Sequence, residues 1–190
     1  ACVSACPTSA LEFTEPSPKE IYSRIANLVS STKKNNEIKN KPVIVFHCEE
    51  MGKSVLEKAA ETQLKYSPSI LPVEVPCLRY VSESNLLYAI SLGAKGVGML
   101  GCENCPNGER ELLYQKLEFS QIILEKFGFG KDRLRLITAE NGFEKDALGI
   151  LDGFSKNLGK SPLTQNLKTP RQTGNREILG EILCDMMDQT

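Results

Sequence analysis

The stretch that decides the fold is Gly101-Cys102-Glu103-Asn104-Cys105-Pro106-Asn107-Gly108, which lies between an apolar run and a helical pattern. The run before it, residues 96–100, predicts a buried strand, and the pattern from about residue 108 onward predicts a long helix. A strand that ends in two thiols and turns directly into a helix should place both sulfurs at the carboxyl edge of a sheet. Open α/β proteins bind their ligands at that edge.

Two further apolar runs end in a cysteine. Residues 43–46 lead to Cys48, and residues 71–76 lead to Cys77. Because parallel strands end at the same edge of a sheet, we expect four thiols from three strand ends to meet at one site.

The rest of the main domain alternates strand and helix patterns. Strands are predicted at 43–47, 70–76, 96–101 and 133–138, and helices at about 53–66, 83–92, 108–127 and 142–157. This alternation predicts an α/β fold, a four-stranded parallel sheet in the order 2-1-3-4 with helices on both faces. No G-x-G-x-x-G loop follows the first strand, so a Rossmann-type dinucleotide site is not expected.

The composition argues against several classes of function for this chain and favours one. The formal charge of the 190 residues is −1, and no basic block suggests a nucleic-acid partner. No apolar run approaches the roughly 20 residues of a membrane span. Seven cysteines, an odd number found mostly at strand ends, favour metal or redox chemistry in a reducing cytoplasm over a disulfide scaffold. The single histidine, His47, excludes ligand sets that need two imidazoles.

The residues alone leave several chemistries open for the four thiols. Thiolates suit iron–sulfur clusters and zinc, and buried thiols without a metal are the third interpretation. A thiol–disulfide enzyme that uses Cys102 and Cys105 is a further possibility, since a C-x2-C pair before a helix can have a lowered thiol pKa. Arg79, Lys95 and His47 are candidates to adjust such a site, or ordinary solvated and capping residues.

The N-terminal Cys2-x3-Cys6-Pro7 resembles the end of the bacterial ferredoxin motif C-x2-C-x2-C-x3-C-P. The resemblance implies that Cys2 and Cys6 each ligate a [4Fe–4S] cluster. The first two cysteines of that motif are absent and the chain opens without Met. We therefore expect a piece of a longer polypeptide, and a [4Fe–4S] cluster only in the intact parent protein.

Three segments carry a second resemblance: Val75-Pro76-Cys77, residues 89–102, and residues 133–140. In their order and spacing they are similar to the delta subunit of methyl-viologen-reducing [NiFe] hydrogenase. This iron–sulfur family also occurs fused to ferredoxin or flavoprotein modules of heterodisulfide reductase-type complexes. The resemblance covers residues 43 to about 154.

The resemblance implies one [2Fe–2S] cluster, held by Cys48, Cys77, Cys102 and Cys105. It implies a non-catalytic electron-transfer subunit between a hydrogenase or dehydrogenase and a heterodisulfide reductase-like flavoprotein. The family has a second cysteine where this chain has Met51, and it spaces the later cysteines more widely, with His following. A cluster-free or zinc-stabilised docking module is therefore the alternative.

The expected organisation has four parts. Residues 1–16 are the tail of the ferredoxin-type motif, 17–41 a helix and linker, 42–158 the hydrogenase delta-subunit-like α/β domain, and 159–190 a polar linker and an amphipathic helix. That last helix should cover its apolar stripe against its own domain or against a partner subunit. Its thiol, Cys184, is predicted to be a small buried residue.

Overall fold

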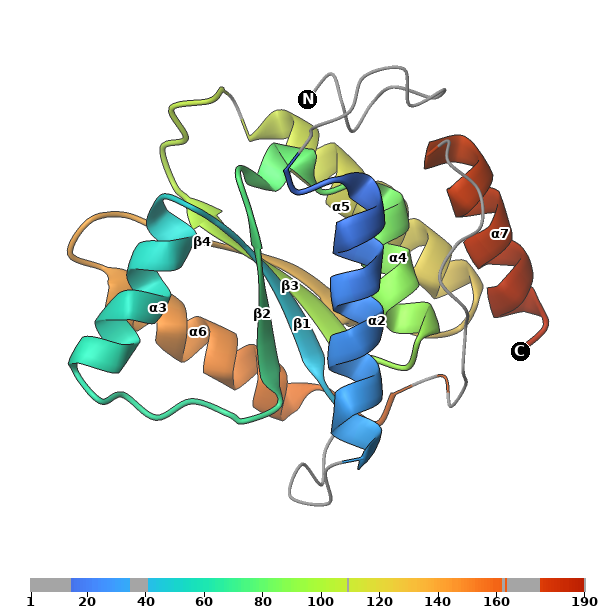
Figure 1. Ribbon diagram of the computed structural model, residues 1–190, viewed down its shortest axis with the longest axis horizontal. Coiled ribbons are helices and arrows are strands. Elements are labelled where there is room, and N and C mark those ends of the chain that lie inside the picture. The colour runs from blue at the N-terminus through green and yellow to red at the C-terminus, as the bar shows by residue number, and fades with distance from the viewer. Residues whose placement is uncertain (1–14, 35–40, 109, 162, 164–174, 190) are drawn as a thin grey trace.

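A computed structural model describes residues 15–34, 41–108, 110–161, 163 and 175–189 of the chain (Figure 1). Its centre is an all-parallel sheet of four strands, which confirms the predicted class. The strands are β1 Val43–Cys48, β2 Ile70–Val75, β3 Gly96–Cys102 and β4 Leu134–Ala139. Their spatial order, β2-β1-β3-β4, is also the predicted one.

Six α-helices in the described residues cover both faces of this sheet. They are α2 Pro18–Lys34, α3 Met51–Glu61, α4 Glu83–Ser91, α5 Glu111–Lys126, α6 Glu144–Asn157 and α7 Asn175–Met187. Helices α3 and α6 pack together on one face, and α2, α4 and α5 lie on the other, with α7 beside α4 (Figure 1). Two short 3-10 turns follow β2 and precede β4, at Leu78–Tyr80 and Lys131–Arg133.

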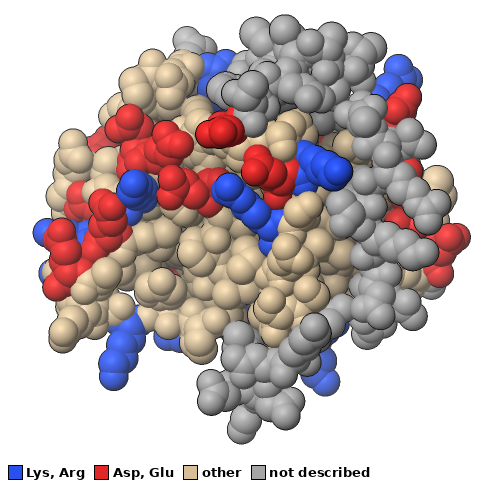
Figure 2. Space-filling model, in the orientation of Figure 1, with Lys and Arg blue, Asp and Glu red and all other residues tan. Residues whose placement is uncertain are grey.

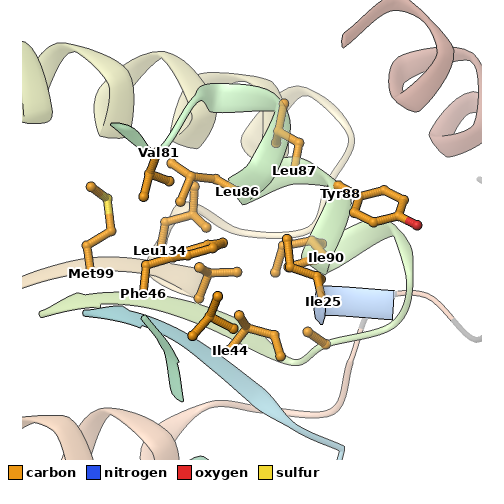
Figure 3. Packing of buried hydrophobic residues seen from close by; sticks show 14 of the residues in the cluster. Ile25, Ile44, Phe46, Val81, Leu86, Leu87, Tyr88, Ile90, Met99 and Leu134 are labelled. Atoms are coloured by element: carbon orange, nitrogen blue, oxygen red, sulfur yellow. The ribbon is translucent and has the colours of Figure 1, made fainter. Parts of the chain in front are cut away.

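Side chains of β1 alternate between the two faces, as a strand requires. Val43 and Val45 belong to the cluster under α3 and α6, whereas Ile44 and Phe46 belong to the larger cluster under α2, α4 and α5. Figure 3 shows Phe46 pointing from the sheet toward Leu86 of α4. Every residue of β1 is buried, which explains why this strand has an unbroken apolar sequence from Val43 to Phe46.

Helix ends differ from the prediction by a few residues. The helix after β1 is Met51–Glu61 and not 53–66, and Gln63, with φ of 51°, lies just beyond its end. The long helix starts at Glu111 and not at 108, because Gly108 has φ of 123°, which a right-handed helix does not allow. The later start of this helix lengthens the loop after β3, at the carboxyl edge of the sheet.

The C-terminal helix α7 packs on its own domain. Ile178, Ile182 and Met186, spaced four residues apart, are buried in the same cluster as α4. Cys184 lies between two of these positions and is exposed, so the prediction that it is buried was wrong. The reason is helical geometry: a residue two positions after Ile182 points about 160° away from it around the helix.

Candidate metal centre

The carboxyl ends of β1, β2 and β3 bring four cysteines together. Cys48 ends β1, Cys102 ends β3, Cys77 follows β2 by two residues, and Cys105 lies in the turn after β3. All four line one pocket, with apolar walls from Leu78, Leu113 and Leu136. We call this cluster of cysteines the four-thiol site.

The first pair of thiols comes from the two central strands. The Sγ atoms of Cys48 and Cys102 are 3.8 Å apart. Four sulfurs bound at about 2.3 Å to one tetrahedral metal also lie about 3.8 Å from each other. The backbone N–H of Gly52 donates to Cys48 Sγ at 3.3 Å, and the backbone N–H of Met51 donates to Cys102. These two donors come from the first turn of α3.

The second pair joins the loop after β2 to the turn after β3. Cys105 is close enough to Cys77 to raise the pKa of its thiol, and the backbone of Arg79 and the side chain of Asn107 lie near enough to lower it. The guanidinium of Arg79 donates in turn to the backbone oxygen of Asn107. This bond ties the two loops together near Cys77 and Cys105.

Burial disfavours the thiolate form of two of the four thiols. It raises the pKa of Cys102 to about 11, and the neighbouring Cys48 and Cys105 thiols contribute to this rise. Burial likewise raises the pKa of Cys77, with Cys105 adding to the effect. A disulfide oxidoreductase needs a thiol with a lowered pKa. The site is thus poorly suited to thiol–disulfide exchange and is one where metal binding would release protons.

The chemical type of the four side chains indicates which metals the site could bind. Four soft thiol ligands at one place suit iron–sulfur clusters or zinc. The free space between them is about 20 Å³, room for about one water molecule. Within the described ranges, no three Cys, His, Asp or Glu side chains already surround a point fit for a single metal ion. The Cys48 and Cys102 sulfurs are in contact, and Cys105 acts on the pKa of Cys77 and of Cys102.

Of the other predicted site residues, those that the structure describes do not line the pocket of the four-thiol site. Cys2 and Cys6 lie outside the described residues. His47 is buried beside Cys48, and burial lowers the pKa of its imidazole, which is neutral at pH 7. Lys95 lies before β3, at the opposite edge of the sheet from the thiols, and its Nζ donates to Ser155 O at 2.6 Å.

Sequence reasoning missed two polar groups near the site. Glu103 accepts hydrogen bonds from Thr138 and, at 2.5 Å, from Arg110, and both bonds lower the pKa of its carboxyl. These bonds fix the turn that carries Cys105. The second group is Lys116 of α5, a lysine inside a mostly apolar buried stripe. That interruption of the stripe is the signal that could have revealed it.

An open groove of about 490 Å³ leads from the thiols to the surface. Cys102 lines both this groove and the pocket of the four-thiol site. Met51 and Asn104 also line it, and Glu50 and Glu140 supply carboxylates at its exposed rim. Figure 2 shows acidic side chains gathered at the upper left, where Figure 1 places the start of α3 and the carboxyl edge of the sheet.

Comparison with known proteins identifies the family of this chain. Residues 43–160 match the family described as methyl-viologen-reducing hydrogenase, delta subunit, which confirms the resemblance seen in the sequence. The vhu iron-sulfur subunit of the F420-non-reducing hydrogenase of Methanococcus voltae is 25% identical over 127 residues, which are 64% of this chain and 95% of that protein. In the part of the chain that the structure describes, no helix has the length and apolar character to cross a bilayer.

Proposed function

Because the chain belongs to the methyl-viologen-reducing hydrogenase delta subunit family, we propose that it is an electron-transfer subunit of a hydrogenase complex. One iron–sulfur cluster would be held by Cys48, Cys77, Cys102 and Cys105. The observation that carries this proposal is the meeting of these four thiols, from three strand ends, around one pocket. The iron–sulfur subunit of the Methanococcus voltae hydrogenase is the relative that supports it.

The pairing of the thiols favours a [2Fe–2S] cluster over a single zinc ion. Cys48 with Cys102 and Cys77 with Cys105 form two pairs, and each pair would hold one iron. A single ion would need at least three donors around one point, and the described side chains offer no such group. Such a cluster, when bound, accepts and releases one electron without a change in any substrate bond.

The protein would hold the negative charge of the thiolates through its backbone. The N–H groups of Gly52, Met51 and Arg79 donate to sulfur atoms of the site. Hydrogen bonds from amides to cluster sulfurs are one of the means by which a protein sets a reduction potential. Leucines on the other walls keep water away from the site.

The groove at Cys102 would be the route for electrons, because Cys102 lines both this groove and the pocket of the four-thiol site. The donors and acceptors would be a hydrogenase or dehydrogenase and a heterodisulfide reductase-like flavoprotein in the cytoplasm. Cys2 and Cys6, by their resemblance to the ferredoxin motif, would contribute ligands to [4Fe–4S] clusters that extend this path.

Met51 is the observation that favours the alternative function. By the family resemblance it occupies the position of a cysteine, and its thioether is an uncharged and weak ligand for ferric iron. A chain that had lost its cluster and kept the fold would be a docking module within the same complex, with or without zinc.

Anaerobic preparation with iron and sulfide distinguishes the two functions. We expect a brown protein with equal amounts of iron and acid-labile sulfide. We expect Cys102→Ser to lose this cluster, and Cys184→Ala, which removes an exposed thiol of α7, to keep it. A colourless protein, or one that binds zinc alone after reconstitution, would establish the docking module.

A further inference from the structure

Lys116 of α5 is buried in the core and not on the surface. It is 3% exposed, on the same face as Leu113, Leu117 and Ser120. Leu113, one helical turn earlier, lines the pocket of the four-thiol site. The lysine therefore enters the core beside the wall of that site.

Its ammonium group holds the loop that carries Cys77. Lys116 Nζ donates to Arg79 O at 3.1 Å and to Val81 O at 2.8 Å. Both oxygens belong to the 3-10 turn that follows Cys77 and to its end, and in this turn Tyr80 N donates to Cys77 O at 2.9 Å. The positive charge is thus fixed one short turn away from a thiol of the site.

A buried ammonium group is unfavourable unless a negative charge is nearby. Burial lowers the pKa of Lys116 to about 8 and the positive charge of Arg79 adds to this effect, whereas Glu83, and Cys77 once it is a thiolate, favour the protonated form. At pH 7 the group therefore keeps its proton. A neutral amide could donate equally well to these two carbonyl oxygens, so these two bonds do not themselves require a charge.

We infer that Lys116 is the buried counter-charge of the four-thiol site and stabilises its reduced state. This inference rests on the proposed function, since it needs a cluster at these thiols. A one-electron reduction, with the electron supplied by a dye of known potential, adds one negative charge and requires no proton. A fixed positive charge nearby favours that added charge and so raises the midpoint potential. Lys116 acts on the site through space and is a positioning residue.

The test compares two buried lysines in the reconstituted protein. Lys116→Gln removes the charge but keeps an amide donor for the two carbonyls, and Lys116→Arg keeps the charge. Lys95→Gln is the matched control, since Lys95 is also buried and also donates to a carbonyl oxygen, at the far edge of the sheet. The readout is the midpoint potential of the cluster in a dye-mediated titration.

We expect Lys116→Gln to shift the redox equilibrium about tenfold toward the oxidised form, which lowers a one-electron midpoint potential by about 59 mV. Lys116→Arg and Lys95→Gln should keep the wild-type potential. If Lys116→Gln does not fold, Lys116→Met provides a second neutral variant. A neutral variant with the wild-type potential, or an equal shift in Lys95→Gln, overturns the inference alone. Wild-type protein that binds no iron overturns the proposed function and this inference together.

Discussion

Replacing Gly52 by alanine should disturb the four-thiol site from the side of α3. Gly52 lies in the first turn of α3, where its backbone N–H donates to Cys48 Sγ at 3.3 Å. A Cβ atom at this position would lie 2.5 Å from Leu100 O and 2.9 Å from His47 Cβ. Neither atom can rotate away, since both are fixed by the central strands. The start of α3 must therefore move outward and lengthen the hydrogen bond to the Cys48 sulfur.

The expected net loss follows from three contributions. Overpacking of a tight site costs about 1–3 kcal/mol. A weakened hydrogen bond to the Cys48 sulfur adds about 0.5–1 kcal/mol. Replacing a glycine by alanine within a helix stabilises the folded state by about 0.5–1 kcal/mol, which offsets part of this loss. We therefore expect Gly52→Ala to lower the free energy of unfolding by about 1–3 kcal/mol.

Urea unfolding of the metal-free protein measures this loss, with Gly149→Ala as the control. Gly149 lies within α6, and a Cβ atom there would meet no atom within 4 Å. The free energy of unfolding of Gly149→Ala should therefore be about 0.5–1 kcal/mol higher than that of the wild type. After reconstitution, Gly52→Ala should also hold less iron than wild type. Equal stabilities of the two alanine variants would refute the view that backbone packing of α3 shapes the site.

Three other predictions concern single side chains. Cys105→Ala should lose the cluster, and Met51→Cys added to it should restore part of the bound iron; a Cys105→Ala protein with full iron would contradict the ligand set. The pKa of Lys116 is lowered from 10.5 to about 8, so between these values the unfolded chain holds a proton that the folded protein lacks. The Lys116 side chain should therefore raise the free energy of unfolding by about 3 kcal/mol as the pH rises through this window. Urea titrations at pH 7.5 and 10 should show this rise in the wild type and not in Lys116→Met. Ile182→Ala should lower the free energy of unfolding by about 2–5 kcal/mol, because Ile182 is buried against α4. Cys184→Ala, at an exposed position, should change it by less than about 0.5 kcal/mol. Similar losses in both variants would contradict the packing of α7.

The sheet could be predicted because its strands carry a strong signal. β1 is buried at every position and has an unbroken apolar sequence up to Phe46, and a parallel α/β sheet has few allowed connections. The meeting of four cysteines follows from the same pattern, since parallel strands end at one edge. These features depend on residue type and order along the chain, which the sequence contains.

The pairing of the cysteines could not be predicted from spacing. Cys102 and Cys105 are separated by two residues, as in a C-x2-C motif, yet Cys102 contacts Cys48 and Cys105 lies close to Cys77. The register of β1 with β3 places their ends side by side, and the turn through Glu103 and Asn104 carries Cys105 to the pocket that Cys77 also lines. Contacts of this kind depend on tertiary structure, and so does the buried position of Lys116.

Position 51, where the family resemblance implies a cysteine, is compatible with a site of four thiols. Met51 is the first residue of α3, and the group that reaches Cys102 is its backbone N–H, which any residue but proline provides. A methionine here therefore removes a thiol but keeps the hydrogen bond to Cys102. Cys105 supplies a fourth thiol from the turn after β3, close to Cys77. We therefore expect the number of thiol donors to stay at four.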